Sequence, residues 1–130
     1  MDRPAIVGID SREEADRTEV TIVLDYRDEE YRGEASGPAG PEAFPRIVGE
    51  ATLRAVEQVA GGGVRLDLEA VATASLGEVQ VAMAQVRLDG DEHRFIGSAL
   101  IEGHDSAAAT VKAVLDAINR QLERILRPAP

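Results

Sequence analysis

His104, Asp105 and Ser106 stand side by side in this chain, and histidine, aspartate and serine are the three residue types of a hydrolytic triad. In such a triad the serine attacks the substrate, the histidine carries the proton and the aspartate orients the histidine. The three residues normally come from separate segments, whereas here they are consecutive. Asp and Ser are also favoured just before a helix, where their side chains accept a backbone hydrogen bond. We therefore expect Asp105 or Ser106 to cap a helix, and we expect the protein not to be an enzyme.

His93 and His104 are the only histidines, and the chain contains no cysteine. A protein zinc site uses three or four ligands, which usually occur at recognisable spacings. No Asp or Glu adds such a spacing to either histidine. The acidic segments 28–30 and 89–92 are typical of solvated turns, and neither has the spacing of a calcium-binding loop. The sequence therefore predicts no metal site and no cofactor.

Small residues on the last predicted strand leave space beside the backbone, and the free N–H groups at the start of a helix can bind a carboxylate or a phosphate. A turn rich in Gly and Pro precedes the first predicted helix in the same way. The candidate ligand-binding residues are Gly40, Pro41, Gly97, Ser98, Ala99, Gly103, His104 and Asp105. Close packing of an alanine-rich helix on the strand would also require small residues, so both interpretations stay open.

The formal net charge of the chain is −10, because 24 acidic residues outnumber 14 basic ones. A nucleic-acid surface needs clustered Lys and Arg, and anionic membranes also attract basic segments. The N-terminus lacks the basic and apolar regions of a signal peptide, and no stretch reaches the roughly 20 apolar residues needed to span a bilayer. We expect a cytoplasmic protein that binds neither nucleic acid nor membrane.

Hydrophobic periodicity places the main elements. Residues 19–26 alternate, with Val20, Ile22 and Leu24 on one face, which is typical of a half-buried strand. Residues 42–60 repeat apolar side chains every three or four positions, which predicts an amphipathic helix. The remaining predicted elements are an edge strand at 5–10, a loop at 11–18, strands at 31–36, 64–75, 78–88 and 93–102, and a helix that begins at Asp105 or Ser106.

These elements predict an α+β fold in the order ββ-α-βββ-α, with a further strand at the start. We expect an antiparallel-rich sheet with the two helices packed on it. Domains commonly contain about 100–150 residues, so the 130 residues of this chain fit a single domain. We expect an N-terminal arm at 1–18, followed by this domain at 19–127.

Four short sequence motifs follow one another along the chain: Gly40-Pro-Glu-Ala43, Glu69-Ala-Val-Ala-Thr73, Gly77-Glu-Val-Gln-Val81 and Ala117-Ile-Asn-Arg120. Their series resembles the C-terminal regulatory domain of 2-isopropylmalate synthase and of the homocitrate and citramalate synthases, and the likeness covers residues 6–126. The resemblance implies an α+β domain that dimerises and binds the pathway's end product between subunits. The chain has no room for the catalytic barrel of those enzymes, and it reads Gly97-Ser-Ala99 where the family has Gly-x-Gly.

Two functions from different classes are therefore expected. The first is a non-catalytic domain that senses a small metabolite, such as an aliphatic amino acid, or that dimerises as a regulatory unit. The alternative is a purely structural protein that builds a homo-oligomer without a ligand. Aromatic residues make up only 3% of the chain, and a core of small side chains buries less apolar area per residue. We therefore expect a homodimer or a higher homo-oligomer, while a different protein partner also stays open.

Overall fold

The computed structural model describes residues 3–126, and its first half forms a three-stranded antiparallel sheet followed by a helix. We call the sheet formed by β1 (Ala5–Glu14), β2 (Arg17–Tyr26) and β3 (Glu29–Pro38) sheet A. The predicted alternation in β2 is confirmed, because Val20, Ile22 and Leu24 are all buried. The helix α1 (Phe44–Val59) carries Pro45 in its first turn, where a missing backbone N–H leaves no hydrogen bond unmade.

The second half of the chain repeats this arrangement. Sheet B is formed by β4 (Leu66–Leu76), β5 (Val79–Leu88) and β6 (Arg94–Leu100), again antiparallel and in chain order, and α2 (Ser106–Ile125) follows it. The α+β class and the element order βββ-α-βββ-α are thus as predicted, with the first strand present. The strands form two separate sheets, however, and each helix packs mainly on the sheet that precedes it.

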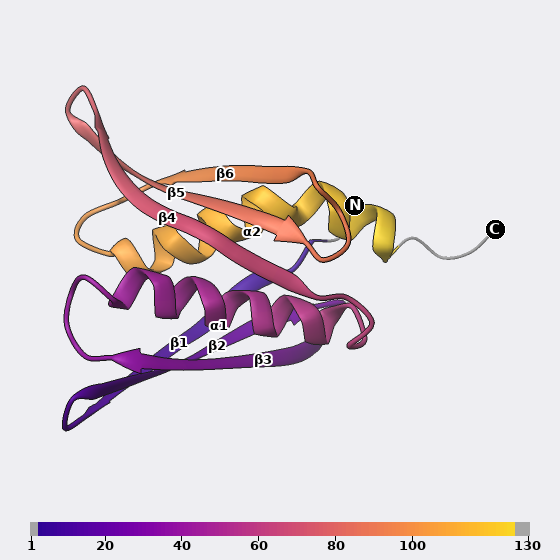
Figure 1. Ribbon diagram of the computed structural model, residues 1–130, viewed down its shortest axis with the longest axis horizontal. Helices are drawn as coiled ribbons and strands as arrows, with labels where there is room; N and C mark the ends of the chain where they lie inside the picture. The colour runs from indigo at the N-terminus through magenta and orange to yellow at the C-terminus, as the bar shows by residue number, and fades with distance from the viewer. Residues whose placement is uncertain (1–2, 127–130) are drawn as a thin grey trace.

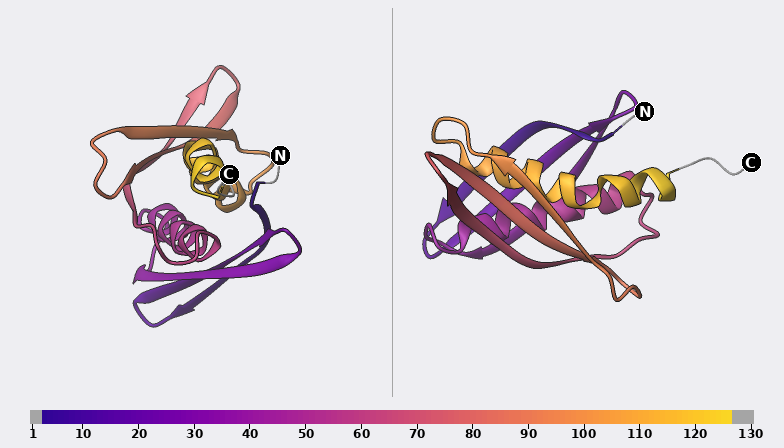
Figure 2. Two further views of the ribbon diagram at one scale, coloured as in Figure 1. Left: turned by 90° about the vertical axis from the view of Figure 1, so that its right-hand side faces the viewer. Right: turned by 90° about the horizontal axis from the view of Figure 1, so that it is seen from above.

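The two helices lie side by side between the two sheets (Figures 1 and 2). Helix α1 packs on β3 and β2 and also contacts β4, while α2 packs on β6 and β5 and contacts α1. Each sheet therefore has an inner face, which packs on a helix, and an outer face, which no element within residues 3–126 covers. The buried core lies at the inner faces and between the helices.

One expected loop is a strand instead. Residues 11–18 carry many charges and were predicted to form a loop, but Ser11 to Glu14 continue β1 and pair with Arg17 to Val20 of β2. The charged side chains fit a strand here because the outer face of sheet A is open to solvent. Residue 18, where the expected N-terminal arm ends, is the second residue of β2, and the expected domain end at 127 lies outside the described residues.

The two halves are structural repeats of one βββα unit. The register shift in the first hairpin lies between Ile6 and Gly8, and that in the second lies between Leu68 and Ala70, an offset of 62 residues. The tight turns that close these hairpins both carry a positive φ, at Ala15 and 62 residues later at Gly77. Equivalent positions in the two sheets can therefore be compared directly.

A glycine on the third strand of each unit allows the helix to approach the sheet. A Cβ atom on Gly33 would lie 2.8 Å from the Cα of Ala55 and would overlap the Ala51 carbonyl oxygen and the Ala55 amide nitrogen. The equivalent residues of the second unit, in the same arrangement, are Gly97, Ala113 and Ala117. The small residues of both units are thus required by close helix-on-strand packing.

Candidate functional site

The three residues that resemble a catalytic triad form a helix start. Asp105 is the N-cap of α2, and its carboxylate accepts a hydrogen bond from the Ala108 N–H at 3.0 Å. Ser106 is the first residue of the helix, and its carbonyl accepts a bond from the Thr110 hydroxyl at 2.8 Å. The predicted capping role is therefore confirmed, with Asp105 as the cap.

The two histidines lie at opposite ends of β6, which has seven residues and spans about 23 Å at the usual rise of a strand. They cannot share a metal ion over this distance. The ring Nδ1 of His93 lies 2.6 Å from Asp91 Oδ1, which also accepts the His93 backbone N–H at 2.8 Å. These bonds lower the pKa of Asp91. Within residues 3–126, no group of three or more His, Asp and Glu side chains could hold a metal ion.

The predicted ligand-binding residues fall into three groups in the structure. The loop between β3 and α1 contains Gly40 and Pro41, and the loop between β6 and α2 contains residues 103–105. Both loops lie at the end of the molecule where the two helices begin, on the left in Figure 1. Residues 97–99 lie within β6, where Gly97 contacts α2 and the Ser98 N–H donates to Asp116 Oδ2 at 3.0 Å. None of the eight residues lines any of the four cavities described here, and their role in ligand binding stays a prediction.

Two of the polar recesses lie beside charged helix residues. One, of about 500 Å³, includes Arg94, Asp116 and Arg120, between α2 and β6. Another, of about 370 Å³, lies where the end of α1 meets the start of β4, and it includes Arg54 and Glu57. A third, of about 230 Å³, follows β2 and β3 on sheet A.

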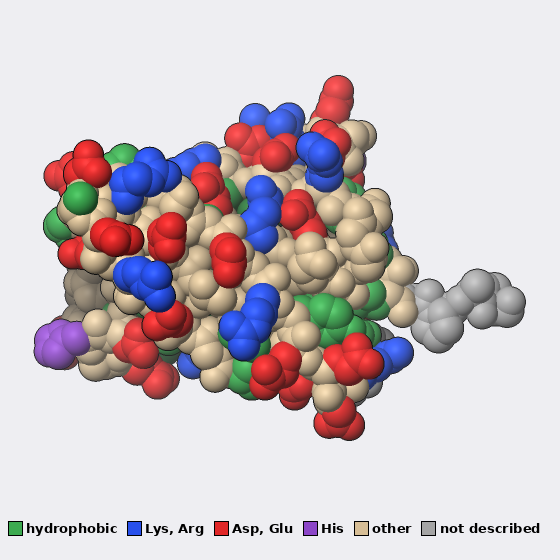
Figure 3. All heavy atoms as spheres, turned by 90° about the horizontal axis from the view of Figure 1, so that it is seen from below, with side chains coloured by type: hydrophobic (Ala, Val, Ile, Leu, Met, Phe, Trp, Pro, Cys, Tyr) green, Lys and Arg blue, Asp and Glu red, His purple; other side chains and the backbone are tan. Residues whose placement is uncertain are grey.

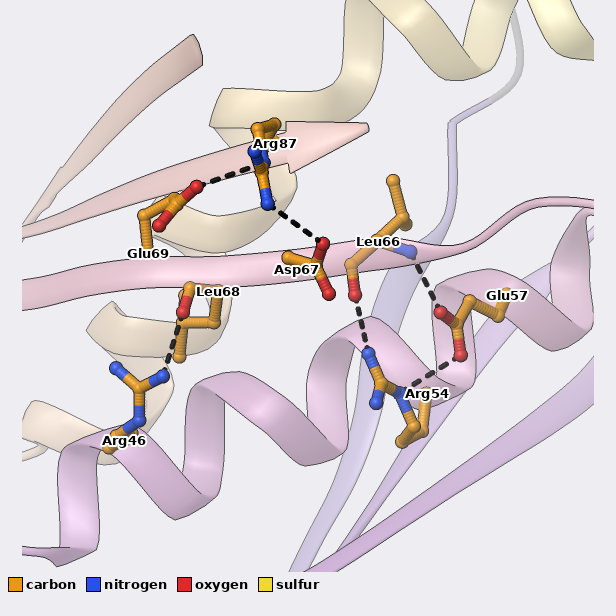
Figure 4. A network of polar contacts seen from close by, with 8 residues as sticks. All are labelled: Arg46, Arg54, Glu57, Leu66, Asp67, Leu68, Glu69 and Arg87. Atoms are coloured by element: carbon orange, nitrogen blue, oxygen red, sulfur yellow. Dashed lines mark hydrogen bonds and ion pairs between the residues drawn. The ribbon is translucent and has the colours of Figure 1, made fainter. Parts of the chain in front are cut away.

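Charged side chains of α1 bind the open edge of β4 in the second of these recesses (Figure 4). The Arg54 guanidinium donates to the Leu66 carbonyl at 2.6 Å, and Glu57 accepts the Leu66 N–H at 2.9 Å. Arg46 donates to the Leu68 carbonyl at 2.8 Å. These groups hydrogen-bond backbone atoms that a neighbouring strand would otherwise use, so they protect the edge of sheet B. Their role in the structure is to join α1 to β4.

This junction gives a first prediction. Replacing Glu57 by alanine removes the acceptor of the Leu66 N–H and the partner of Arg54, and is expected to lower the free energy of unfolding by about 1–2 kcal/mol. The control is Glu50→Ala, which breaks only the exposed ion pair with Arg46 and should change stability by less than about 0.5 kcal/mol. Urea denaturation measures both, and equal losses for the two variants would contradict the structural role of Glu57.

The outer face of sheet B is apolar. Alternate residues of each strand point away from the helices, and those of β4, β5 and β6 lie in cross-strand rows such as Ala72, Met83 and Ser98. The large hydrophobic residues exposed on this face are Leu76 (71%), Val79 (43%), Ile96 (71%) and Leu100 (55%). A shallow recess of about 210 Å³ between β4 and Ile96 is lined almost entirely by apolar atoms. Four of the five large hydrophobic residues that are exposed in the described part of the chain thus share one surface.

The outer face of sheet A is charged, although the fold of the two units is the same. Figure 3 views the molecule from the side of sheet A and shows acidic and basic side chains spread over it, with few hydrophobic ones. The structural equivalents of Leu76, Val79, Ile96 and Leu100 are Glu14, Arg17, Arg32 and Ser36. The βββα fold therefore does not require an apolar outer face.

The sequence itself contains a signal for this apolar surface. From Ala70 to Ala84 hydrophobic residues occupy both faces of the hairpin, and Glu78 in the turn is the only charged residue of the stretch. Strands that are apolar on both faces are typical of sheets that are covered on both sides. One covering layer is the helix layer of this chain, and no element within residues 3–126 supplies the other.

Comparison of the sequence with protein-family models and with curated protein sequences gives no match. The resemblance to the synthase regulatory domain therefore stays a proposal. Neither of the two described helices is both long and apolar enough to cross a bilayer.

Proposed function

We propose that this chain is a non-catalytic assembly module, whose function is to bury the outer face of sheet B against another protein. The observation that carries the proposal is the difference between two equivalent surfaces. In the first unit the outer face bears residues such as Glu14 and Arg32, and in the second unit the same positions are Leu76 and Ile96.

The energetics favour a covered surface. Each square ångström of apolar surface removed from water contributes about 25 cal/mol, so an open sheet face of this composition is unfavourable. Single exposed hydrophobic residues are common on proteins, whereas a contiguous apolar patch marks an interaction site. Because the equivalent face in sheet A is charged, the demands of folding do not account for the apolar face of sheet B. Binding does.

Sensing of an aliphatic amino acid is the competing proposal, and the apolar recess beside Ile96 offers one surface for an aliphatic group. The recess could hold an aliphatic group, but its lining residues contain no charged side chain: Ala70, Val71, Ala72, Met83, Ala84, Gln85 and Ile96. An amino acid would bring an ammonium and a carboxylate group, each of which needs a polar partner when it leaves water. The surface is therefore better suited to a protein partner, and the dimeric state implied by the family resemblance agrees with this proposal.

Site-specific photo-crosslinking tests the proposal. A photoreactive phenylalanine analogue at Ser98 would lie on the outer face of sheet B, and the same analogue at Glu34 would occupy the equivalent exposed position on sheet A. We expect protein adducts in the expressing cells from position 98 and none from position 34. Adducts at neither position, or equally at both, would contradict the proposal. A rise in melting temperature with an aliphatic amino acid, without adducts at 98, would favour sensing instead.

A further inference from the structure

We infer that the protein that covers the outer face of sheet B is a second copy of this chain, related to the first by a twofold axis that runs along β5. This inference rests on the proposed function and names its partner. The relief, the charge and the size of the outer face of sheet B all favour a second copy.

The relief of the outer face has a low side and a high side. Along most of its length the edge strand β4 contributes Ala70, Ala72 and Ala74, whose side chains rise little above the sheet, and only its last residue, Leu76, is large. The opposite edge strand β6 contributes Ile96 and Leu100, which stand out into solvent. The apolar recess extends from Ala70 and Ala72 across β5 to Ile96, so it lies next to the raised side chains of β6. One surface thus carries both a groove and a ridge.

A twofold axis parallel to the strands brings the two sides together. Rotation by half a turn about β5 exchanges the two edges of the sheet, so β4 of each copy lies over β6 of its partner. The residues Ile96 and Leu100 then pack on the alanine strip, and this happens twice by symmetry. An axis across the strands would instead lay β4 on β4 and β6 on β6, so that the two alanine strips face each other and leave a void. Packed sheets with nearly aligned strands are common, at a separation of about 10 Å.

The charges of the molecule are compatible with this arrangement. Arg87 is the basic residue of the outer face of β5, and it pairs with Glu69 at 2.9 Å and with Asp67 at 3.5 Å, at the end of the face away from Leu76. The charged outer faces of sheet A point away from each other in such a dimer. The apolar rows contain no cluster of acidic residues that a partner with a basic surface could bind. A second copy of this chain instead presents an apolar face that matches them.

The size of the face sets the expected strength. The ten residues of β5 and the width of the three-stranded sheet give a face of about 33 by 14 Å at standard strand spacings. Two such faces bury about 900 Å² in projection, which is below the roughly 1,200–2,000 Å² of stable interfaces and within the range of weak, transient ones. We therefore expect a reversible dimer with a dissociation constant in the micromolar range, about 1–50 µM. Because each copy has a net charge of −10, higher salt should strengthen the dimer by screening the repulsion.

Sedimentation velocity of the purified chain, from 0.5 to 200 µM, tests the inference. The variant Ile96→Arg with Leu100→Ser gives sheet B the residues that sheet A carries at the equivalent positions, Arg32 and Ser36, so the fold should tolerate it. We expect the native chain to dimerise and this variant to bind itself at least 100-fold more weakly. The control Arg32→Glu changes the charge on sheet A at the position equivalent to Ile96 and should leave the dimer within a factor of three. Circular dichroism checks that each variant is folded.

Crosslinking tests the direction of the axis. The chain has no cysteine, so Ala72→Cys and Ser98→Cys introduce single thiols in one cross-strand row, on β4 and β6. A short bis-maleimide should join the two variants in a mixture far more than either variant to itself. Stronger joining of Ala72→Cys to itself would overturn the axis along β5.

The outcomes separate the two proposals. A native chain that stays monomeric at 200 µM, or an Ile96→Arg, Leu100→Ser variant that still dimerises, overturns the second copy as partner. If the chain is monomeric and position 98 crosslinks to a different protein, the assembly function stands and only this inference fails. If position 98 crosslinks to nothing, both fail.

Discussion

Replacing Gly33 by alanine is expected to destabilise the protein by about 3 kcal/mol, and Gly97→Ala should have a similar effect. The new Cβ would overlap backbone atoms of the helix above it, in each unit at the same two helix positions. Backbone atoms within a helix cannot rotate away as a flexible side chain can, so the whole helix has to move off the sheet. That movement loosens the packing of the buried residues that follow it along the helix.

The control for this prediction is Gly8→Ala on β1. A Cβ on Gly8 would lie 3.8 Å from the Cβ of Val23, an ordinary van der Waals distance. We expect its free energy of unfolding to change by less than about 0.5 kcal/mol. Chemical denaturation at one fixed protein concentration measures the variants, because dimerisation would make stability depend on concentration. A Gly33→Ala variant as stable as Gly8→Ala would show that the helices do not approach the sheets as closely as described.

The elements that could be predicted from the sequence are those whose pattern is decided locally. The alternation of Val20, Ile22 and Leu24 places a strand without any knowledge of its neighbours, and Asp105 precedes an amphipathic run as an N-cap should. Residues 11–14 contain no hydrophobic residue, so no periodicity can reveal them as a strand. Their conformation comes from pairing with β2, which is a tertiary effect.

The order of the predicted elements already repeats loosely, but the residues themselves do not, because few of them have to be the same in both units. The positions where the helix meets the third strand are identical, Gly33 with Gly97 and Ala55 with Ala117, since no larger residue fits. At most other equivalent positions the two units differ, as with Ile22 and Ala84, because any set of side chains that fills the core will serve. Close helix-on-strand contacts determine the backbone arrangement of both units. Only the few residues at these contacts have to be the same in the two units.

The candidate site also could not be predicted from residue types alone. Histidine, aspartate and serine together suggested chemistry by residue type, but type alone does not give geometry, and Asp105 is used by the helix cap. The apolar surface of sheet B has no chemical motif at all. It becomes visible only when the outer faces of two equivalent sheets are compared, which requires the register of both.

Ile22→Ala is the second substitution with a large expected effect. Ile22 is fully buried on the inner face of sheet A, and it pairs with Gly33, the residue on which α1 lies. Removing most of its side chain leaves a cavity between sheet and helix, and we expect a loss of about 3–4 kcal/mol in the free energy of unfolding. Alanine is the native residue at the equivalent position of sheet B, Ala84, so the strand itself tolerates the change and the loss measures packing alone.

The neighbouring substitution Val23→Ala serves as the control, since Val23 points to the outer face of the same strand. We expect it to lose less than about 1 kcal/mol, because a partly exposed side chain leaves no closed cavity. The comparison also bears on the interface. If Val23→Ala were as destabilising as Ile22→Ala, the outer face of sheet A would be buried in solution, and the contrast with sheet B on which the assembly proposal rests would be lost. A large loss at Ile22 with a small loss at Val23 leaves sheet B as the face that needs a partner.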